Sequence, residues 1–187
     1  MTEASTTQSD GPGLAALLIA LLLWLTAAIP VSASDAIASA GDALQIVLPA
    51  TAGGLTLGLR DWQGSLQLAE SSALTLGVTY GLKYSVHETR PNGGSQSFPS
   101  GHTSISFSAA EFMRKRYGWE YGVPAYAAAS FVAYSRVEAG EHHPHDVVAG
   151  AAIGIMSSYL FTRPYKGWHV EVEADGKSYG VSFSHTW

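Results

Sequence analysis

Residues 99–107 read Pro-Ser-Gly-His-Thr-Ser-Ile-Ser-Phe, and this stretch joins a short loop to a helix start. Gly101 has no Cβ, so the backbone at this position can come close to an anion. The sequence from Thr103 onward predicts a helix, whose first N–H groups point toward the loop and favour negative charge. Ser100 adds a hydroxyl donor. The stretch therefore predicts a cradle for a phosphate group at the beginning of a helix.

Permanent cations flank this cradle in the sequence, at Lys83, Arg90 and Arg136. A phosphoryl group in transfer spreads negative charge over its equatorial oxygens and requires positioning and electrostatic stabilisation. A guanidinium group can bind two phosphate oxygens at once, and a lysine supplies a point charge. We therefore expect Lys83, Arg90, Ser100, Gly101 and Arg136 to bind the phosphate of a substrate.

Two histidines, His102 and His142, suit the two halves of a covalent phosphatase cycle. One imidazole attacks phosphorus, and the other protonates the departing oxygen. Asp146 follows His142 by four residues, and in a helical or turn-like backbone this spacing places the carboxylate beside the imidazole. There it would orient the ring and stabilise its cation. We assign His142 as the nucleophile, His102 as the general acid and Asp146 as the partner of His142.

These residues resemble the three signature motifs of the type 2 phosphatidic acid phosphatase superfamily. That family includes lipid phosphatases, bacterial class A acid phosphatases and vanadium haloperoxidases. Its motifs match this sequence at Lys83–Pro91, Pro99–His102 and Ser135–Asp146, with no signature position substituted. The resemblance implies a helical bundle and a phosphatase reaction that proceeds through a phosphohistidine intermediate without a metal.

Uncharged stretches outside the motifs predict an all-α fold, a helical bundle with a small C-terminal β-hairpin. The uncharged stretches are 43–59, 71–82, 121–135 and 147–162. Their many small residues permit close helix packing, and signature residues lie at their ends. We therefore expect the site at one end of the bundle, and we expect Pro49 and Gly53-Gly54 to interrupt the first stretch.

The C-terminal region, 168–187, changes to an alternating pattern around Asp175-Gly176, a dipeptide typical of hairpin turns. We predict a hairpin whose aromatic face packs against the helices, or alternatively rests on a membrane surface.

The N-terminal region, 1–33, has an almost wholly apolar stretch at 14–29 that is followed by small residues. This pattern indicates a secretory signal peptide, although no Lys or Arg precedes it. An uncleaved membrane anchor is the second interpretation, and a wrongly assigned start codon is the third. In the first two cases, the helical phosphatase domain at 34–167 lies in the bacterial cell envelope and faces the periplasm.

Composition limits the function classes further. A chain of 187 residues with 47% hydrophobic content suits one catalytic domain. Its net charge of −5 argues against nucleic acid as a partner. Because the chain has no cysteine, a disulfide framework and a thiol mechanism are excluded.

Clustered histidines in residues 142–146, His-His-Pro-His-Asp, are also typical of divalent metal sites. Pro144, however, breaks a regular helix between His143 and His145, and neither cysteine nor a His-Glu-x-x-His motif is present. We therefore expect no metal and no cofactor, and we expect these two histidines to face solvent or to support the site. His87 could contact substrate or lie on the surface.

The substrate class follows from the uncharged helices and the short linker between the first two motifs. These features favour a membrane-associated enzyme that acts on a lipid phosphate, such as phosphatidate, phosphatidylglycerophosphate, an isoprenyl phosphate or a lipid A type lipid. Helices of about sixteen residues and a mean hydropathy of +0.11 are also consistent with a soluble periplasmic acid phosphatase acting on small phosphomonoesters. A vanadate-dependent haloperoxidase and a non-catalytic phosphate-binding protein are further alternatives, and the intact histidines argue against the latter.

Overall fold

The computed structural model describes residues 33–165, 167–174 and 179–186. These residues belong to one compact unit that begins at Ala33. The predicted signal peptide or anchor at 1–33 therefore lies outside the described residues, apart from Ala33.

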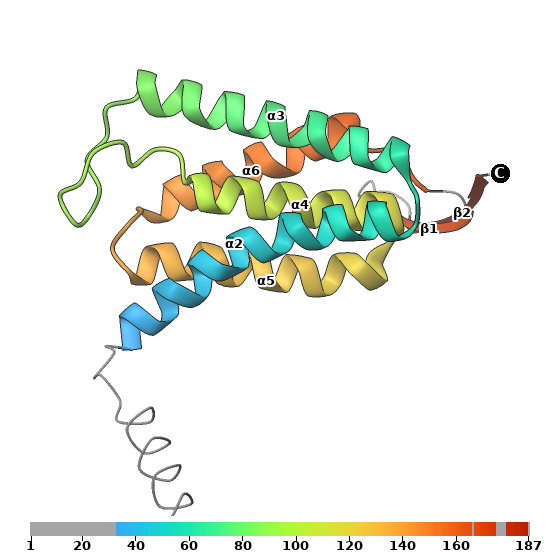
Figure 1. Ribbon diagram of the computed structural model, residues 1–187, viewed down its shortest axis with the longest axis horizontal. Helices are drawn as coiled ribbons and strands as arrows, with labels where there is room; N and C mark the ends of the chain where they lie inside the picture. Colours follow the sequence, from blue (N-terminus) through green and yellow to red (C-terminus); the bar gives the residue numbers. More distant parts are fainter. Residues whose placement is uncertain (1–32, 166, 175–178, 187) are drawn as a thin grey trace, which may run out of the picture. The chain divides into compact units, whose positions relative to one another are not determined.

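The described unit is a helical bundle followed by a two-stranded hairpin, so the predicted all-α fold class is confirmed (Figure 1). Its elements are α2 (Ala33–Gly58), α3 (Trp62–Ser85), α4 (Gly101–Tyr117), α5 (Trp119–Glu138), α6 (Pro144–Phe161), β1 (Gly167–Ala174) and β2 (Tyr179–Thr186). The strands pair antiparallel, with Val172 opposite Val181. The turn predicted at Asp175-Gly176 lies outside the described residues, and of the hairpin's aromatic residues only the backbone is described, so the packing of that face stays a prediction.

Helix α4 is the centre of the bundle, because it contacts each of the other described helices (Figure 1). Two glycines of α6 allow the closest approach. A Cβ atom at Gly150 would lie 2.6 Å from the Ser100 carbonyl oxygen, and one at Gly154 would lie 2.2 Å from the Ser104 carbonyl oxygen. Any larger residue at these positions would push α6 away from α4. The small-residue pattern of the sequence therefore serves helix packing.

The start of α6 corrects one prediction about Pro144. Proline does not break the helix but occupies its first position, where its fixed φ angle is suitable and no N–H is needed. His143 caps the helix, and its N–H donates to Asp146 Oδ2 at 2.8 Å. His145 and Asp146 therefore lie in the first turn.

The predicted interruption at Pro49 and Gly53-Gly54 is wrong, since α2 continues through both. Proline removes one helical hydrogen bond, but Leu48 and Ala52 on the inner face are 5% and 0% exposed. Burial of this face stabilises the helix enough to offset the lost hydrogen bond.

The interior of the bundle is unusually rich in hydroxyl groups. Thr75 donates to Ser108 at 3.1 Å, and Thr79 donates to Ser104 at 2.9 Å. The Ser158 hydroxyl donates to the Ser108 carbonyl oxygen at 2.7 Å. These bonds satisfy buried polar groups between α3, α4 and α6.

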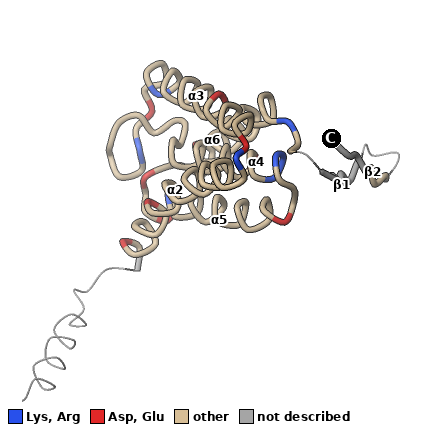
Figure 2. Tube along the Cα trace, turned by 45° about the vertical axis from the view of Figure 1, so that its right-hand side comes forward, with Lys and Arg blue, Asp and Glu red and all other residues tan. Residues whose placement is uncertain are grey.

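The outer surface, by contrast, exposes large apolar side chains on every described helix except α4. Examples are Ile46, Val47 and Leu57 on α2, Trp62, Leu66 and Tyr84 on α3, Val123 and Tyr134 on α5, and Val148, Met156 and Leu160 on α6. Charged residues lie mostly at helix ends and in loops (Figure 2). In the described part of the chain, no helix combines the length and apolarity that crossing a membrane requires.

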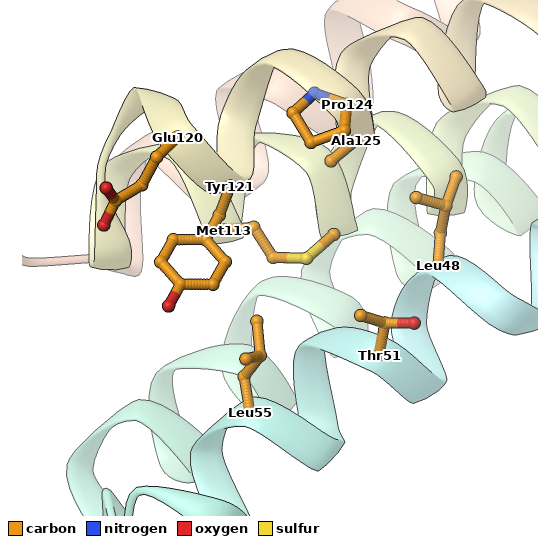
Figure 3. Close-up of a pocket in the computed structure, with 8 residues that line it drawn as sticks. All are labelled: Leu48, Thr51, Leu55, Met113, Glu120, Tyr121, Pro124 and Ala125. Carbon is orange, nitrogen blue, oxygen red and sulfur yellow. The ribbon is translucent and has the colours of Figure 1, made fainter.

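Helices α2 and α5 converge toward the end of the bundle where α4 begins. A Cβ atom at Gly41 of α2 would lie 2.0 Å from the Ser135 hydroxyl of α5. Toward the other end, the two helices border an apolar cavity of about 320 Å³ (Figure 3). Leu48 and Leu55 of α2 face Tyr121 and Pro124 of α5 across this cavity. The contact between α2 and α5 is therefore tightest beside the predicted site.

The end of the bundle away from the predicted site is held by buried ion pairs. Asp61 accepts two bonds from the Arg116 guanidinium, at 2.7 and 2.5 Å, and one from the Tyr117 hydroxyl at 2.9 Å. Glu111 accepts two from Arg114, at 2.7 and 2.6 Å. These cations serve the packing of the helices and not the site.

Candidate active site

One cavity of about 400 Å³ brings together residues from all three sequence motifs. The predicted site residues that line it are Lys83, Arg90, Gly101, His102 and His142. Lys83 lies in the last turn of α3, Arg90 in the following loop and His142 in the loop before α6, while Gly101 and His102 begin α4. The helix ends therefore supply the site, as the sequence predicted for one end of the bundle.

The remaining predicted residues, Ser100, Arg136 and Asp146, are buried and do not line the cavity. The Ser100 hydroxyl accepts from the Thr103 N–H at 3.4 Å, and therefore caps α4. Asp146 lies next to His142 and Arg136 lies near His102, each set back from the cavity. Exposed His87 does not line the cavity either.

His142 and Asp146 form a buried pair. The His142 side chain is 3% exposed, and its Nδ1 lies 3.4 Å from Asp146 Oδ2, which is long for a hydrogen bond. The same carboxylate oxygen accepts from the Ser97 hydroxyl at 2.5 Å and from the His143 N–H at 2.8 Å. Asp146 is thus fixed from two sides, and Nε2 of His142 remains for a ligand in the cavity.

Electrostatics sets the protonation of this pair. Burial, together with the positive charges of Lys83 and Arg90, lowers the pKa of His142 to about 4, although Asp146 opposes the shift. Burial tends to raise the pKa of Asp146, but hydrogen bonds from Ser97 and the His143 N–H outweigh it and hold that pKa below its usual range. At neutral pH the pair is therefore a neutral imidazole beside a carboxylate, which is the state that a nucleophile requires.

His102 lies on the other side of the cavity, and its partner is Asp42 of α2. His102 Nε2 lies 3.1 Å from Asp42 Oδ1, and the His102 side chain is one-third exposed. Burial and the charges of Arg136 and Arg90 lower the pKa of His102, while Asp42 acts to raise it. Asp42 therefore both orients the imidazole and favours its protonated form.

Arg136 is directed at α2 and not at the cavity. It donates to Asp42 Oδ1 at 2.7 Å, to the Ala38 carbonyl oxygen at 2.5 Å and to the Ser135 hydroxyl at 3.2 Å. These bonds hold the buried guanidinium near His102 but out of the cavity lining. Its positive charge therefore acts on the cavity without direct contact.

The two cations that line the cavity also have protein partners. Arg90 pairs with Glu141, and its Nε donates to the Ser95 carbonyl oxygen at 3.2 Å. The Lys83 ammonium donates to the Gln96 carbonyl oxygen at 2.7 Å. Burial, followed by the charge of Arg90, lowers the pKa of Lys83, and Asp146 acts in the opposite direction.

Sequence reasoning missed Asp42, Gln96, Ser97 and Glu141. One signal for Asp42 was available, because it is the single charge between Asp35 and Arg60 in an otherwise uncharged stretch. Gln96 and Ser97 lie in the loop between the first two motifs, and Glu141 occupies a position within the third motif that carries no signature residue, so nothing in their spacing distinguishes them.

Comparisons with known proteins agree with this geometry. A model of the PAP2 superfamily matches residues 64–168, a range that includes every predicted site residue. The lipid A 4'-phosphatase of Helicobacter pylori (strain J99) is 36% identical over 193 residues, which cover 91% of this chain and 97% of that protein. The lipid A 1-phosphatase of Porphyromonas gingivalis is 36% identical over 108 residues, which cover 54% of this chain and 24% of that protein.

The fold also resembles a solved structure. The crystal structure of Aquifex aeolicus LpxE superimposes with a TM-score of 0.57 at 23% identity, covering 76% of this chain and 92% of that chain. Taken with the sequence matches, this fold shows that the chain is a phosphatase that belongs to the PAP2 superfamily.

Proposed function

We propose that this protein is a membrane-associated lipid phosphatase that removes a phosphate from a lipid A type substrate, on the periplasmic side of the bacterial cell envelope. The reaction proceeds through a phosphohistidine and uses no metal. The observation that carries this proposal is the cavity in which a neutral, carboxylate-backed His142 faces His102, Lys83 and Arg90.

In the first step, His142 Nε2 attacks phosphorus while the bond from phosphorus to the lipid oxygen breaks. His102 gives its proton to that oxygen, and the lipid leaves as an alcohol. Asp146 stabilises the imidazolium character that develops on His142. Lys83 and Arg90 balance the charge on the phosphoryl oxygens.

In the second step, water attacks the phosphohistidine. His102, now neutral, accepts a proton from that water, and the bond from phosphorus to His142 breaks. Inorganic phosphate leaves, and both histidines return to their starting protonation states.

Support for a lipid substrate comes from the surface and from the similarity of the whole chain. The described helices expose large apolar side chains around the bundle, a surface that suits contact with lipid. The relative that aligns over 97% of its own length is a lipid A 4'-phosphatase. We therefore favour a lipid A type substrate over the other lipid phosphates and over a small soluble phosphomonoester.

The test is phosphate release by the wild-type protein and by His142→Ala, measured on lipid A in detergent and on p-nitrophenyl phosphate, with EDTA present. We expect the wild type to act on lipid A and the variant to be inactive. His87→Ala removes an exposed histidine outside the cavity and is the matched control, which should keep full activity. Faster turnover of the soluble ester would overturn the lipid assignment, and wild-type turnover by His142→Ala would overturn the mechanism.

A further inference from the structure

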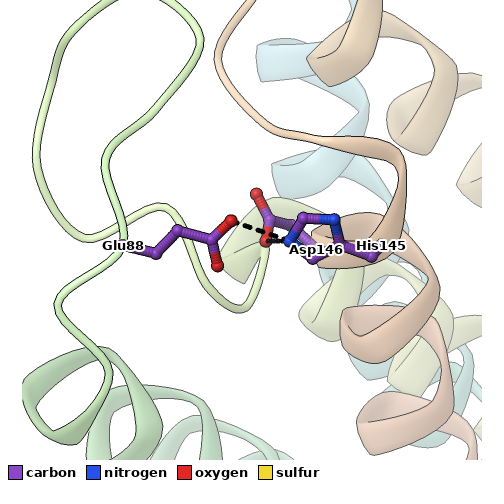
Figure 4. A group of neighbouring side chains, drawn as sticks. All are labelled: Glu88, His145 and Asp146. Atoms are coloured by element: carbon purple, nitrogen blue, oxygen red, sulfur yellow. Dashed lines mark hydrogen bonds and ion pairs between the residues drawn. The ribbon is translucent and has the colours of Figure 1, made fainter.

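Glu88 and His145 form a cluster with the catalytic residue Asp146, and the proposed reaction uses neither Glu88 nor His145. Each contributes one metal-ligating atom, and these atoms lie within 4.8 Å of one another. Glu88 comes from the loop after α3, and the other two lie in the first turn of α6, so that the side chains converge from two segments (Figure 4).

We propose that Glu88, His145 and Asp146 bind a divalent cation of the zinc type, and that this cation inhibits the enzyme. The binding site stands on the geometry of the cluster alone. Its inhibitory effect rests on the proposed function.

The spacing of the cluster suits zinc. His145 Nε2 lies 2.8 Å from Glu88 Oε1 and 3.2 Å from Asp146 Oδ1. Tetrahedral ligands at about 2.0 to 2.1 Å from a zinc ion lie roughly 3.3 Å from one another. Small movements of the partly exposed Glu88 and His145 side chains would therefore admit the ion. Two carboxylates and one imidazole leave a fourth position for water, whereas calcium requires six or more oxygen ligands.

One buried atom of the cluster, Asp146 Oδ1, accepts no hydrogen bond, and its neighbour in the cluster is His145 Nε2 at 3.2 Å. The Asp146 side chain is fully buried, and its Oδ1 accepts no hydrogen bond, although Oδ2 is bonded to Ser97 and His143. A buried carboxylate oxygen that accepts no hydrogen bond is costly. Because Oδ1 points to the side of His145 and away from the bonds that Oδ2 makes, a cation there would satisfy it without displacing them.

The His145 ring is already held near the required orientation. It stacks on the His143 ring with 5.3 Å between centroids, and on the Phe98 ring with 6.2 Å. A ligand that is positioned before binding loses less conformational entropy when the ion arrives.

Inhibition follows from the dual position of Asp146. The same carboxylate would face the cation through Oδ1 and the His142 imidazole through Oδ2. A divalent cation withdraws negative charge from the carboxylate, so Asp146 stabilises the developing imidazolium less well. Zinc also joins the Glu88 loop to the first turn of α6.

The experiment titrates zinc chloride into metal-free, untagged full-length protein by calorimetry, for the wild type, Glu88→Gln and His145→Asn. His87→Asn, which removes an exposed neighbouring histidine, is the matched control. We expect one zinc per chain in the wild type and in the control, and at least tenfold weaker binding in the two cluster variants. With cobalt chloride as a second probe, the visible absorption of a low-coordinate cobalt site should follow the same order.

Activity on lipid A supplies the second readout. Zinc should inhibit the wild type and His87→Asn at the concentration at which it binds, and EDTA should reverse the effect. Glu88→Gln and His145→Asn should keep their metal-free activity and resist zinc. Equal zinc binding by all four proteins, no binding by the wild type, or binding without inhibition would each overturn the proposal. A wild type that binds zinc at the cluster but hydrolyses no phosphoester would instead overturn the proposed function and leave the binding site standing.

Discussion

Asp42 Oδ1 lies 2.7 Å from the Arg136 guanidinium, and this ion pair joins α2 to α5 at the active site. The same oxygen lies 3.1 Å from His102 Nε2. One carboxylate thus holds both a signature arginine and the proposed general acid. Asp42 is about half exposed whereas Arg136 is 4% exposed, so the ion pair joins a buried guanidinium to a carboxylate that solvent can reach.

Replacement of Asp42 by asparagine should move the basic limb of the pH profile for kcat to lower pH. Asp42 acts to raise the pKa of His102, so its removal lowers that pKa further. A general acid must be protonated, and activity is lost as the pH rises through its pKa. Lipid A, with an alkoxide leaving group, should show a larger effect than p-nitrophenyl phosphate. Asp35→Asn, at an exposed position near the start of α2, is the control, and an unchanged basic limb in Asp42→Asn would contradict the assignment.

The fall of kcat/KM at low pH, the acid limb of its pH profile, should follow the protonation of His142. Its pKa of about 4 means that the imidazole is neutral above about pH 5, so activity should persist in mild acid and fall as the pH drops through 4. Lys83→Met removes one of the charges that lower this pKa. The acid limb should therefore shift to higher pH, in addition to any loss of rate. A limb that stays in place in Lys83→Met would show that the charge of Lys83 does not lower the pKa of His142.

The Ser97 hydroxyl should matter to catalysis although it does not line the cavity. Ser97→Ala removes the 2.5 Å bond to Asp146, so the carboxylate is held less firmly behind His142. A hydrogen bond to a charged group contributes about 1.5 to 3 kcal/mol, and we expect a fall in kcat of about tenfold or more with little change in KM. Ser95→Ala, in the exposed part of the same loop, is the matched control and should behave as the wild type.

Gly154→Ala should destabilise the bundle. The added methyl group would lie 2.2 Å from the Ser104 carbonyl oxygen, which must move. Such overpacking costs about 1 to 3 kcal/mol. Gly81→Ala in α3 meets nothing within 4 Å and should be neutral or stabilising, by up to about 1 kcal/mol, because alanine is the better helix former. Urea unfolding in detergent, followed by circular dichroism, compares the two variants, and equal midpoints would contradict the packing argument.

Much of the site was predictable because the motif residues lie at the ends of helices. Their residue types, and the resemblance of the three motifs to those of the superfamily, predicted that Lys83, His102 and His142 belong together, and the cavity contains all three. Asp42 was not predictable in this way, because its contacts with His102 and Arg136 depend on how α2 packs against α4 and α5. Contacts between distant segments follow from packing, which single-sequence patterns do not encode.

The fold, like the site, was predictable from the sequence only in part. The uncharged stretches predicted the helices, but the expectation that proline interrupts a helix was wrong at two positions. At Pro49 the burial of neighbouring side chains outweighed the lost hydrogen bond, and at Pro144 the residue began a helix that it was expected to interrupt. In both cases the local preference was real, but tertiary context and position within the helix decided the outcome.

The hydroxyl pairs between α4 and its neighbours fix how far each helix extends toward the cavity. An apolar interface tolerates sliding, because one methyl group replaces another. The bonds from Thr75 to Ser108 and from Thr79 to Ser104 hold the two helices in their observed register, and a slip of half a turn, about 2.7 Å, would separate both pairs inside the bundle. Lys83 follows Thr79 on α3, and His102 precedes Ser104 on α4. The polar interior thus sets the positions of Lys83 and His102 along their helices, and with them how far both side chains extend into the cavity.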